Sequence, residues 1–316
     1  MSSKGAVAVI GAGLMGTSWA GLFAAHGYEV RLYDGDPIVS ERAPKQAAAI
    51  TRFLVAKGLA DSRPAEEGLS ALRRSATLEE AVAEAALVQE CVPDNLALKC
   101  AVFARISRAA PEDALIASST SGLSMTAIQR DAHLPGRTFA AHPFNPPHLV
   151  PLVELAAGDR TDPGVLERAR LFYLGLGKQP VVLKGDIPGY IGNRLADALW
   201  REAVQLVRSG AATVEDVDRV VRYGLGLRWA VVGPHLTFHL AGGEAGIRGH
   251  LACQTATRER ILRDLADWTA VPADTADALL PGLEAETDGK SVSQLEAERD
   301  ETLAAVLRAL TNAGTR

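Results

Sequence analysis

Apolar residues along the first part of the chain form short continuous runs that alternate with longer segments of helical spacing. The short runs are typical of buried strands and the longer segments of helices. Strands are expected at 6–10, 29–33, 87–90, 114–117, 139–141, 150–155 and 180–184. Strands separated by helices form parallel β-α units, so the pattern predicts an α/β fold with a doubly wound, Rossmann-type sheet.

The pattern changes near residue 185, after which only helical spacing continues. Apolar residues between 191 and 207 predict a helix that ends at Gly210, and Thr213 with Asp216 resembles a capping box that begins the next helix. The segment 291–310 is expected to be an amphipathic helix. A chain of 316 residues exceeds the usual size of a single core. We therefore expect a Rossmann domain over 1–185 and an all-helical domain over 186–316.

The apolar segment 5–28 carries no fixed charge, which by itself would also fit an export signal or a membrane span. It contains six glycines, however, and three of them form the pattern G-x-G-x-x-G between a strand and a helix. This position favours a nucleotide-binding turn over a membrane segment. A tight turn without a ligand remains the alternative.

In such a turn the glycines allow a sharp bend, close approach of the backbone to a pyrophosphate, and close packing of helix on strand. The phosphates then face the free N–H groups of the helix N-terminus. Asp34, 18 residues after Gly16, the last glycine of this pattern, is placed to accept hydrogen bonds from the adenosine ribose and to repel a 2'-phosphate. NAD is therefore expected in preference to NADP. The expected contacts are Gly11, Ala12, Gly13, Leu14, Met15, Gly16 and Asp34.

Charge and cysteine content narrow the class of protein further. The formal net charge is −5, and acidic and basic residues are interspersed, which indicates neither a nucleic-acid partner nor a basic membrane patch. Three cysteines without a C-x-x-C pair favour neither a disulfide framework nor a zinc site, and no metal is expected. These features favour a protein that acts on small molecules in the reducing cytoplasm.

The segment AHPFNPPHLVPLVEL (141–155) places His142 twelve residues before Glu154. Two prolines follow Asn145, so the chain after His142 must turn or extend. Such a loop can return a strand that carries Glu154 alongside His142. A histidine held by a carboxylate is a tuned general base.

Four segments resemble ordered motifs of the L-3-hydroxyacyl-CoA dehydrogenase family and its relatives that act on free acids. The segments are SSTSGL (118–123), HPFNPP (142–147), VPLVEL (150–155) and PGYIGNRL (188–195). The resemblance implies that the catalytic residues are Ser121, His142, Glu154 and Asn193. It also implies cofactor contacts at Asp94, Lys99 and Asn145. The alternatives that Ser121 only caps a helix and Asn193 only bonds backbone stay open.

Within this family, QECVPDNLALK (89–99) and GLGLRWAVVGP (224–234) look most like the lambda-crystallin group, which includes L-gulonate 3-dehydrogenase. That group usually has Glu where this chain has Asp94. AGGEAGIR (241–248) also resembles L-carnitine dehydrogenase. The resemblance further implies a homodimer formed through the helical domain.

These features predict an NAD-dependent L-3-hydroxyacid dehydrogenase, in which His142 removes the hydroxyl proton and Glu154 stabilises the imidazolium. Ser121 and Asn193 are expected to hydrogen-bond the substrate oxygen. Arg228 is expected to be buried or half-buried and to bind a substrate carboxylate, with an ordinary surface stack on Trp229 as the alternative. A thioester dehydrogenase, a polyketide 3-oxo reductase and a non-catalytic crystallin-like protein remain rival functions.

Overall fold

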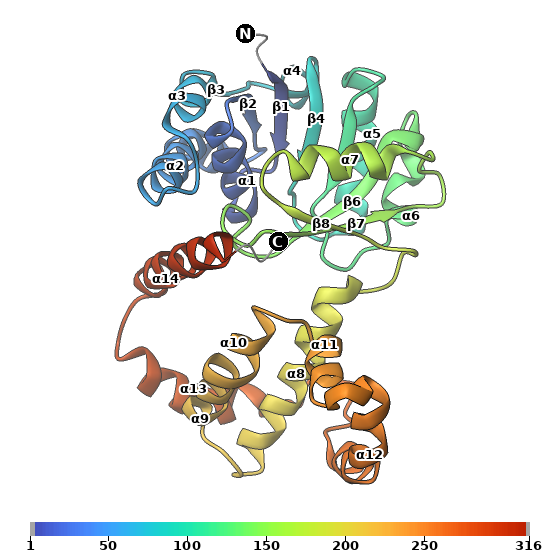
Figure 1. Ribbon diagram of the computed structural model, residues 1–316. Helices are drawn as coiled ribbons and strands as arrows, with labels where there is room; N and C mark the ends of the chain where they lie inside the picture. Colours follow the sequence, from blue (N-terminus) through green and yellow to red (C-terminus); the bar gives the residue numbers. More distant parts are fainter. Residues whose placement is uncertain (1–3, 314–316) are drawn as a thin grey trace. The chain divides into compact units, whose positions relative to one another are not determined.

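The structure is a computed structural model that describes residues 4–313 (Figure 1). The chain divides into two compact units, residues 1–193 and 194–316. The boundary expected from the sequence lies after residue 185, and residues 186–193 are grouped with the first unit. The site described below shows the reason, because two backbone N–H groups of this segment bind Glu154.

An eight-stranded sheet forms the first unit, in the order β3-β2-β1-β4-β5-β6-β7-β8. The strands are β1 (Lys4–Ile10), β2 (Tyr28–Tyr33), β3 (Leu72–Arg74), β4 (Ala85–Glu90), β5 (Leu115–Ser118), β6 (Thr138–Pro143), β7 (Leu152–Ala157) and β8 (Gln179–Val182). Each of the seven expected strands is present. The three-residue edge strand β3 was not expected, because its sequence LRR carries no apolar run.

Neighbouring strands are parallel except for β6 and β7, which are antiparallel. This antiparallel pair contains the loop that was expected to return Glu154 alongside His142. A parallel return needs a crossover of a dozen or more residues, and the segment between Pro143 and Leu152 is shorter than that. In the antiparallel register His142 lies directly opposite Glu154.

Helices cover both faces of this sheet. They are α1 (Leu14–Ala25), α2 (Pro37–Ala56), α3 (Ser62–Ser70), α4 (Leu78–Val82), α5 (Leu96–Ala109), α6 (Met125–Ile128) and α7 (Val165–Leu174). Apolar residues of α4, α5 and α6 pack with the strands in one core cluster, whereas Trp19 of α1 contacts Tyr173 of α7 on the other face. Nearly all residues of helix α1 are buried against this face of the sheet, which accounts for the apolar composition of the helix. No helix within residues 4–313 is long and apolar enough to cross a membrane.

The second unit is helical, as expected. Its helices are α8 (Tyr190–Arg208), which starts in the first unit, then α9 (Val214–Val220), α10 (Gly226–Trp229), α11 (Pro234–Leu240), α12 (Gly246–Asp264), α13 (Thr275–Thr287) and α14 (Val292–Asn312). The capping box of Thr213 and Asp216 is present, and Ser291 with Gln294 forms another at α14. A π-helical turn, Val221–Leu225, follows α9.

Candidate active site

The glycine-rich turn between β1 and α1 has the geometry of a phosphate-binding turn. Gly11 has φ +91°, and a Cβ there would lie 2.7 Å from the backbone of Cys91. A Cβ on Gly16 would lie 1.9 Å from the carbonyl oxygen of Gly11. These two glycines are therefore required by the turn and by the packing of α1 on the sheet.

Gly13 differs from these two glycines, because the protein itself does not require it. Its φ of −70° suits any residue, and a Cβ there would meet no atom within 4 Å. No side chain of the described residues caps the first turn of α1, and that turn carries no acidic residue. Open space beside Gly13 and uncapped N–H groups are what a dinucleotide pyrophosphate needs, so these residues fit NAD.

Asp34 follows β2 and lies beside this turn. Its Oδ2 accepts the backbone N–H of Ala12 at 2.7 Å, and its Oδ1 accepts the N–H of Asp36 at 2.9 Å. The carboxylate is thus oriented from both sides at the position where a Rossmann fold binds the adenosine ribose.

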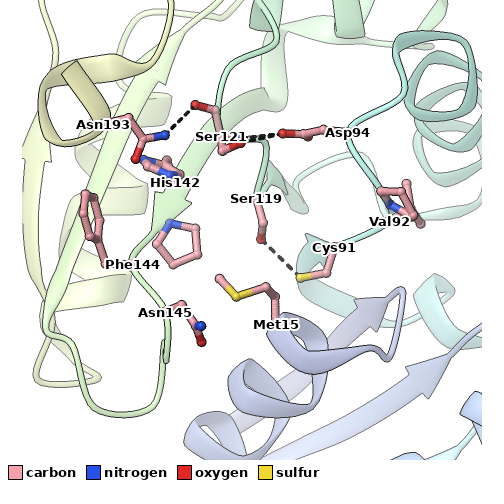
Figure 2. Close-up of a pocket in the computed structure, with 12 residues that line it drawn as sticks. Met15, Cys91, Val92, Asp94, Ser119, Ser121, His142, Phe144, Asn145 and Asn193 are labelled. Atoms are coloured by element: carbon pink, nitrogen blue, oxygen red, sulfur yellow. Dashed lines mark hydrogen bonds between the residues drawn. The ribbon is translucent and has the colours of Figure 1, made fainter. Parts of the chain in front are cut away.

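A cavity of about 440 Å³ opens at the carboxyl ends of the central strands, beyond the glycine turn. Such a position is the usual ligand site of an open α/β sheet. Figure 2 shows the side chains that surround it. The lining residues are Met15, Cys91, Val92, Pro93, Asp94, Ser119, Ser121, His142, Pro143, Phe144, Asn145 and Asn193. Six predicted site residues, Met15, Asp94, Ser121, His142, Asn145 and Asn193, therefore line one cavity.

His142, on β6, is paired with Glu154, on β7. The Nδ1 atom of His142 donates to Oε2 of Glu154 at 3.0 Å, and the side chains are 6% and 2% exposed. The ring lies between Phe144 and Tyr190, at centroid distances of 5.3 and 5.2 Å. Because Nδ1 is occupied, Nε2 is the ring nitrogen that can exchange a proton with a ligand.

Glu154 is fixed by the first turn of α8 as well as by His142. Its Oε1 accepts the N–H groups of Ile191 at 2.9 Å and Gly192 at 3.0 Å. A carboxylate at a helix N-terminus is stabilised by the helix dipole. Gly192 permits this approach, since a Cβ there would lie 2.3 Å from Cζ of Phe144.

Ser121 bonds to Asp94 in this structure. The Oγ of Ser121 donates to Oδ2 of Asp94 at 2.7 Å, and the Ser121 N–H donates to the same oxygen at 3.0 Å. Asn193 donates from Nδ2 to the Ser121 carbonyl at 3.1 Å (Figure 2). Asn193 thus makes the backbone bond that the sequence left open as an alternative. Both side chains line the cavity, and their contact with the substrate oxygen stays a prediction.

Asp94 is the one charged carboxylate that lines the cavity. Burial opposes its charged form, but the two hydrogen bonds from Ser121 and the nearby Lys99 hold the pKa of Asp94 below its ordinary value. Its ammonium partner, Lys99, lies 3.4 Å from Oδ1. The negative charge of Asp94 is therefore maintained at neutral pH.

Lys99 is buried beside Glu90 and Asp94, and its expected contact with the cofactor stays a prediction. Its side chain is 1% exposed, it does not line the cavity, and Nζ donates to both carboxylate oxygens of Glu90 at 2.8 and 3.0 Å. The buried Glu90 carboxylate also accepts from Ser118 Oγ at 2.6 Å. A buried carboxylate requires such a partner, so the Lys99 ammonium serves Glu90 and Asp94.

Arg228, on α10 of the second unit, is exposed, whereas the sequence interpretation expected a buried or half-buried guanidinium. The reason is local: α10 is a four-residue helix with no buried residue. A role for Arg228 toward a substrate carboxylate stays a prediction.

Sequence reasoning missed several residues that shape the site. Tyr190 has φ +50°, is buried and lies against His142, and Phe144 covers the other side of the ring. The signal for Tyr190 was the pair Gly189–Tyr190, at which the chain bends before α8. Cys91 also lines the cavity, and burial raises the pKa of its thiol to about 12; all three cysteines are free thiols. Within residues 4–313 no cluster of three His, Cys, Asp or Glu side chains could hold a metal.

Comparison with known proteins agrees with this geometry. Residues 6–187 match the sequence profile described as 3-hydroxyacyl-CoA dehydrogenase, NAD binding domain, and residues 189–279 match the profile of the C-terminal domain. L-carnitine dehydrogenase of Streptomyces griseus is 43% identical over 308 residues, which cover 96% of this chain and 89% of that protein. The enzyme of the same name from Pseudomonas putida is 38% identical over 96% of this chain and 93% of its own length.

Two solved structures extend the comparison to the fold. 5-Formyl-3-hydroxy-2-methylpyridine 4-carboxylic acid 5-dehydrogenase, described as an NAD+-dependent dismutase, has a TM-score of 0.82 and 32% identity, covering 96% of this chain and 98% of that chain. A 3-hydroxyacyl-CoA dehydrogenase from Archaeoglobus fulgidus has a TM-score of 0.67 and 29% identity, covering 98% and 99%.

Proposed function

The chain belongs to the 3-hydroxyacyl-CoA dehydrogenase family, and we propose that its substrate within this family is a free L-3-hydroxy acid, with L-carnitine as the first to test. The protein is an NAD-dependent dehydrogenase that acts on a CH–OH group. The observation that supports catalysis is the buried pair of His142 and Glu154 at the wall of the cavity. Identities near 40% over most of the chain support the free acid.

The roles of the residues follow from their contacts. Bound NAD would supply the hydride acceptor, held by the glycine turn and Asp34. His142 Nε2 takes the hydroxyl proton of the substrate, because Nδ1 already donates to Glu154. Glu154 stabilises the imidazolium and keeps the ring in the tautomer that leaves Nε2 free to accept. Asn193 and Ser121 would orient the substrate oxygen.

Rival functions make different demands on this site. A non-catalytic crystallin-like protein needs no histidine whose tautomer is fixed by a buried carboxylate, so the His142–Glu154 pair favours an enzyme. A thioester enzyme must also hold the phosphates of CoA. None of the described residues that line the cavity is Lys or Arg, so a CoA phosphate would find no guanidinium or ammonium partner there.

We also propose a cytoplasmic homodimer that associates through the helical domain. The support is the set of apolar side chains that the second unit exposes. It includes Val220, Tyr223, Leu227, Val231, Leu240 and Leu262. Analytical ultracentrifugation would test the dimer, and a monomer at micromolar concentration would contradict it. The three free cysteines suit a reducing compartment.

A substrate panel tests the proposed function. L-carnitine, L-gulonate and L-3-hydroxybutyrate are assayed with NAD, and acetoacetyl-CoA and an aromatic 3-oxo acid with NADH, at 340 nm. We expect the highest kcat/KM with a free acid, and a kcat lower by about 10²- to 10⁴-fold in His142→Gln. A preference for acetoacetyl-CoA would assign the protein to the thioester branch, and an inactive wild type across the panel would contradict the proposal.

A further inference from the structure

The loop that joins β6 to β7 carries Asn145 and Phe144 into the cavity, and three of its residues are prolines. We refer to residues 144–151 as the proline loop. Proline has no N–H group, so the loop has few donors of its own for its carbonyl groups. Leu149 and Val150 both donate to the Pro146 carbonyl at 3.0 Å, which leaves the carbonyls of Pro147 and Val150 to find donors elsewhere.

Lys178, immediately before β8, supplies both of these hydrogen bonds. Its Nζ donates to the carbonyl of Pro147 at 2.6 Å and to that of Val150. The side chain is buried, at 3% exposed, and no ion pair is found for it among residues 4–313. An unpaired buried ammonium is costly, and burial lowers the pKa of Lys178 to about 7. Sequence reasoning did not single out this residue.

The same ammonium also touches α1. Nζ of Lys178 lies 5.1 Å from the ring centroid of Trp19, a fully buried residue of that helix. The preceding residue, Ser18, forms a second tie to the loop: its Oγ accepts the backbone N–H of His148 at 2.9 Å and lies 2.8 Å from His148 Nδ1. The proline loop is thus fastened to α1 at two points.

Helix α1 and the proline loop each contribute a residue to the cavity beside the glycine turn. The first turn of α1 offers the uncapped N–H groups beside Gly13, and Met15, which lies between Gly13 and Gly16, lines the cavity. Asn145 comes from the proline loop to the same cavity, on the side where Figure 2 shows Met15. The spacing between these elements therefore decides whether both can contact one bound molecule.

We propose that Lys178 is a positioning residue for NAD. Its contacts with the Pro147 and Val150 carbonyls and with Trp19, which we call the clamp, hold the proline loop against α1. Asn145 and the glycine turn are thereby kept at a fixed spacing. Lys178 touches neither cofactor nor substrate. The inference rests on NAD binding by the family and not on the identity of the substrate. Loss of the clamp leaves two buried carbonyls without donors and frees the loop, so cofactor binding must then order it.

The test compares Lys178→Met with Lys184→Met, which removes an exposed lysine from the same stretch of chain. NADH binding is measured by fluorescence titration, and hydrogen exchange of the amides at 145, 148, 149 and 150 is measured without cofactor. We expect Lys178→Met to bind NADH at least 10-fold more weakly and to exchange faster in the proline loop. At saturating NADH, the fold decrease in the kcat of Lys178→Met should be smaller than the fold decrease in its affinity for NADH. Lys184→Met should match the wild type in each measurement.

Unchanged NADH affinity in a folded Lys178→Met protein would overturn the proposal, even if its melting temperature were lower. If that variant does not fold, Lys178→Gln replaces it, because its amide can donate to one of the two carbonyls. A loss of NADH affinity of about 3-fold or more then supports the clamp, and wild-type affinity overturns it. Since NADH binding needs no substrate, failure of the substrate panel would leave this result unaffected.

Discussion

Glu154→Gln is the substitution that tests the base most directly, because it changes one atom and keeps the shape of the side chain. Oε1 of Glu154 accepts two backbone N–H groups, from Ile191 and Gly192. The amide NH2 of glutamine cannot face two donors without losing both hydrogen bonds. The glutamine oxygen must therefore occupy the Oε1 position, and its NH2 must face His142.

An NH2 group opposite Nδ1 reverses the hydrogen bond that His142 makes. Nδ1 must then accept, so the proton moves to Nε2, and the ring presents a donor where the reaction needs an acceptor. Loss of a positioned base or of its tautomer costs about 10²- to 10⁴-fold in rate, or about 3 to 5 kcal/mol in activation free energy. Stability should change little, since the number of hydrogen bonds is kept.

The assay is oxidation of the best substrate at 340 nm, together with fluorescence titration of NADH and thermal unfolding. Glu66→Gln, which changes an exposed glutamate of α3, is the matched control. We expect Glu154→Gln to lose kcat while NADH affinity stays within about 2-fold of the wild type. A kcat within 3-fold of the wild type would refute the assigned tautomer, and an equal loss of NADH affinity would show that Glu154 acts through the fold.

Three further predictions follow from single contacts. Asp34→Ser should narrow the preference for NAD over NADP in kcat/KM, because repulsion of a 2'-phosphate disappears; a wild type that uses both equally would contradict the role of Asp34. Gly192→Ala should lower kcat by at least 10-fold, because its Cβ would lie 2.3 Å from Phe144 and displace the turn that binds Glu154; a crystal structure with this turn unmoved would contradict the reasoning. Between pH 7 and about 10.4 the unfolded chain holds a proton on Lys178 that the folded protein has released. The free energy of unfolding should therefore rise with pH by up to about 1.4 kcal/mol per unit in the wild type relative to Lys178→Met, and parallel stability curves would contradict the lowered pKa.

Local chemistry predicted the parts of the site that depend on it. The glycine turn could be predicted because its three glycines lie within six residues of sequence, between a strand and a helix. The pairing of His142 with Glu154 could be anticipated because the prolines between them disfavour a helix, so that a loop can return the second strand beside the first. The resemblance to a known family placed Ser121, Asn193 and Asn145 at the same cavity.

The features that could not be predicted from the sequence depend on contacts between segments that are distant along the chain. The ion pair of Lys99 with Glu90 could not be predicted, because the burial of Glu90 is set by the whole sheet. Lys178 looked like one lysine among others, because its partners are carbonyl groups, which leave no trace in side-chain identity. The exposure of Arg228 depends on how the short helix α10 packs, which apolar spacing does not specify.

The bonds from Ile191 and Gly192 to Glu154 have a consequence for how the two parts of this chain could be separated or recombined. A Rossmann domain cut at residue 185, where the strand pattern ends, would lose both donors that hold the carboxylate. It would keep the glycine turn and Asp34, and with them the features that bind a nucleotide, but its histidine would lack a fixed tautomer. The residues that fix the catalytic histidine therefore extend beyond the end of the strand pattern, into the first turn of α8. A chimera that exchanges helical domains would have to carry the first turn of α8 with the Rossmann partner.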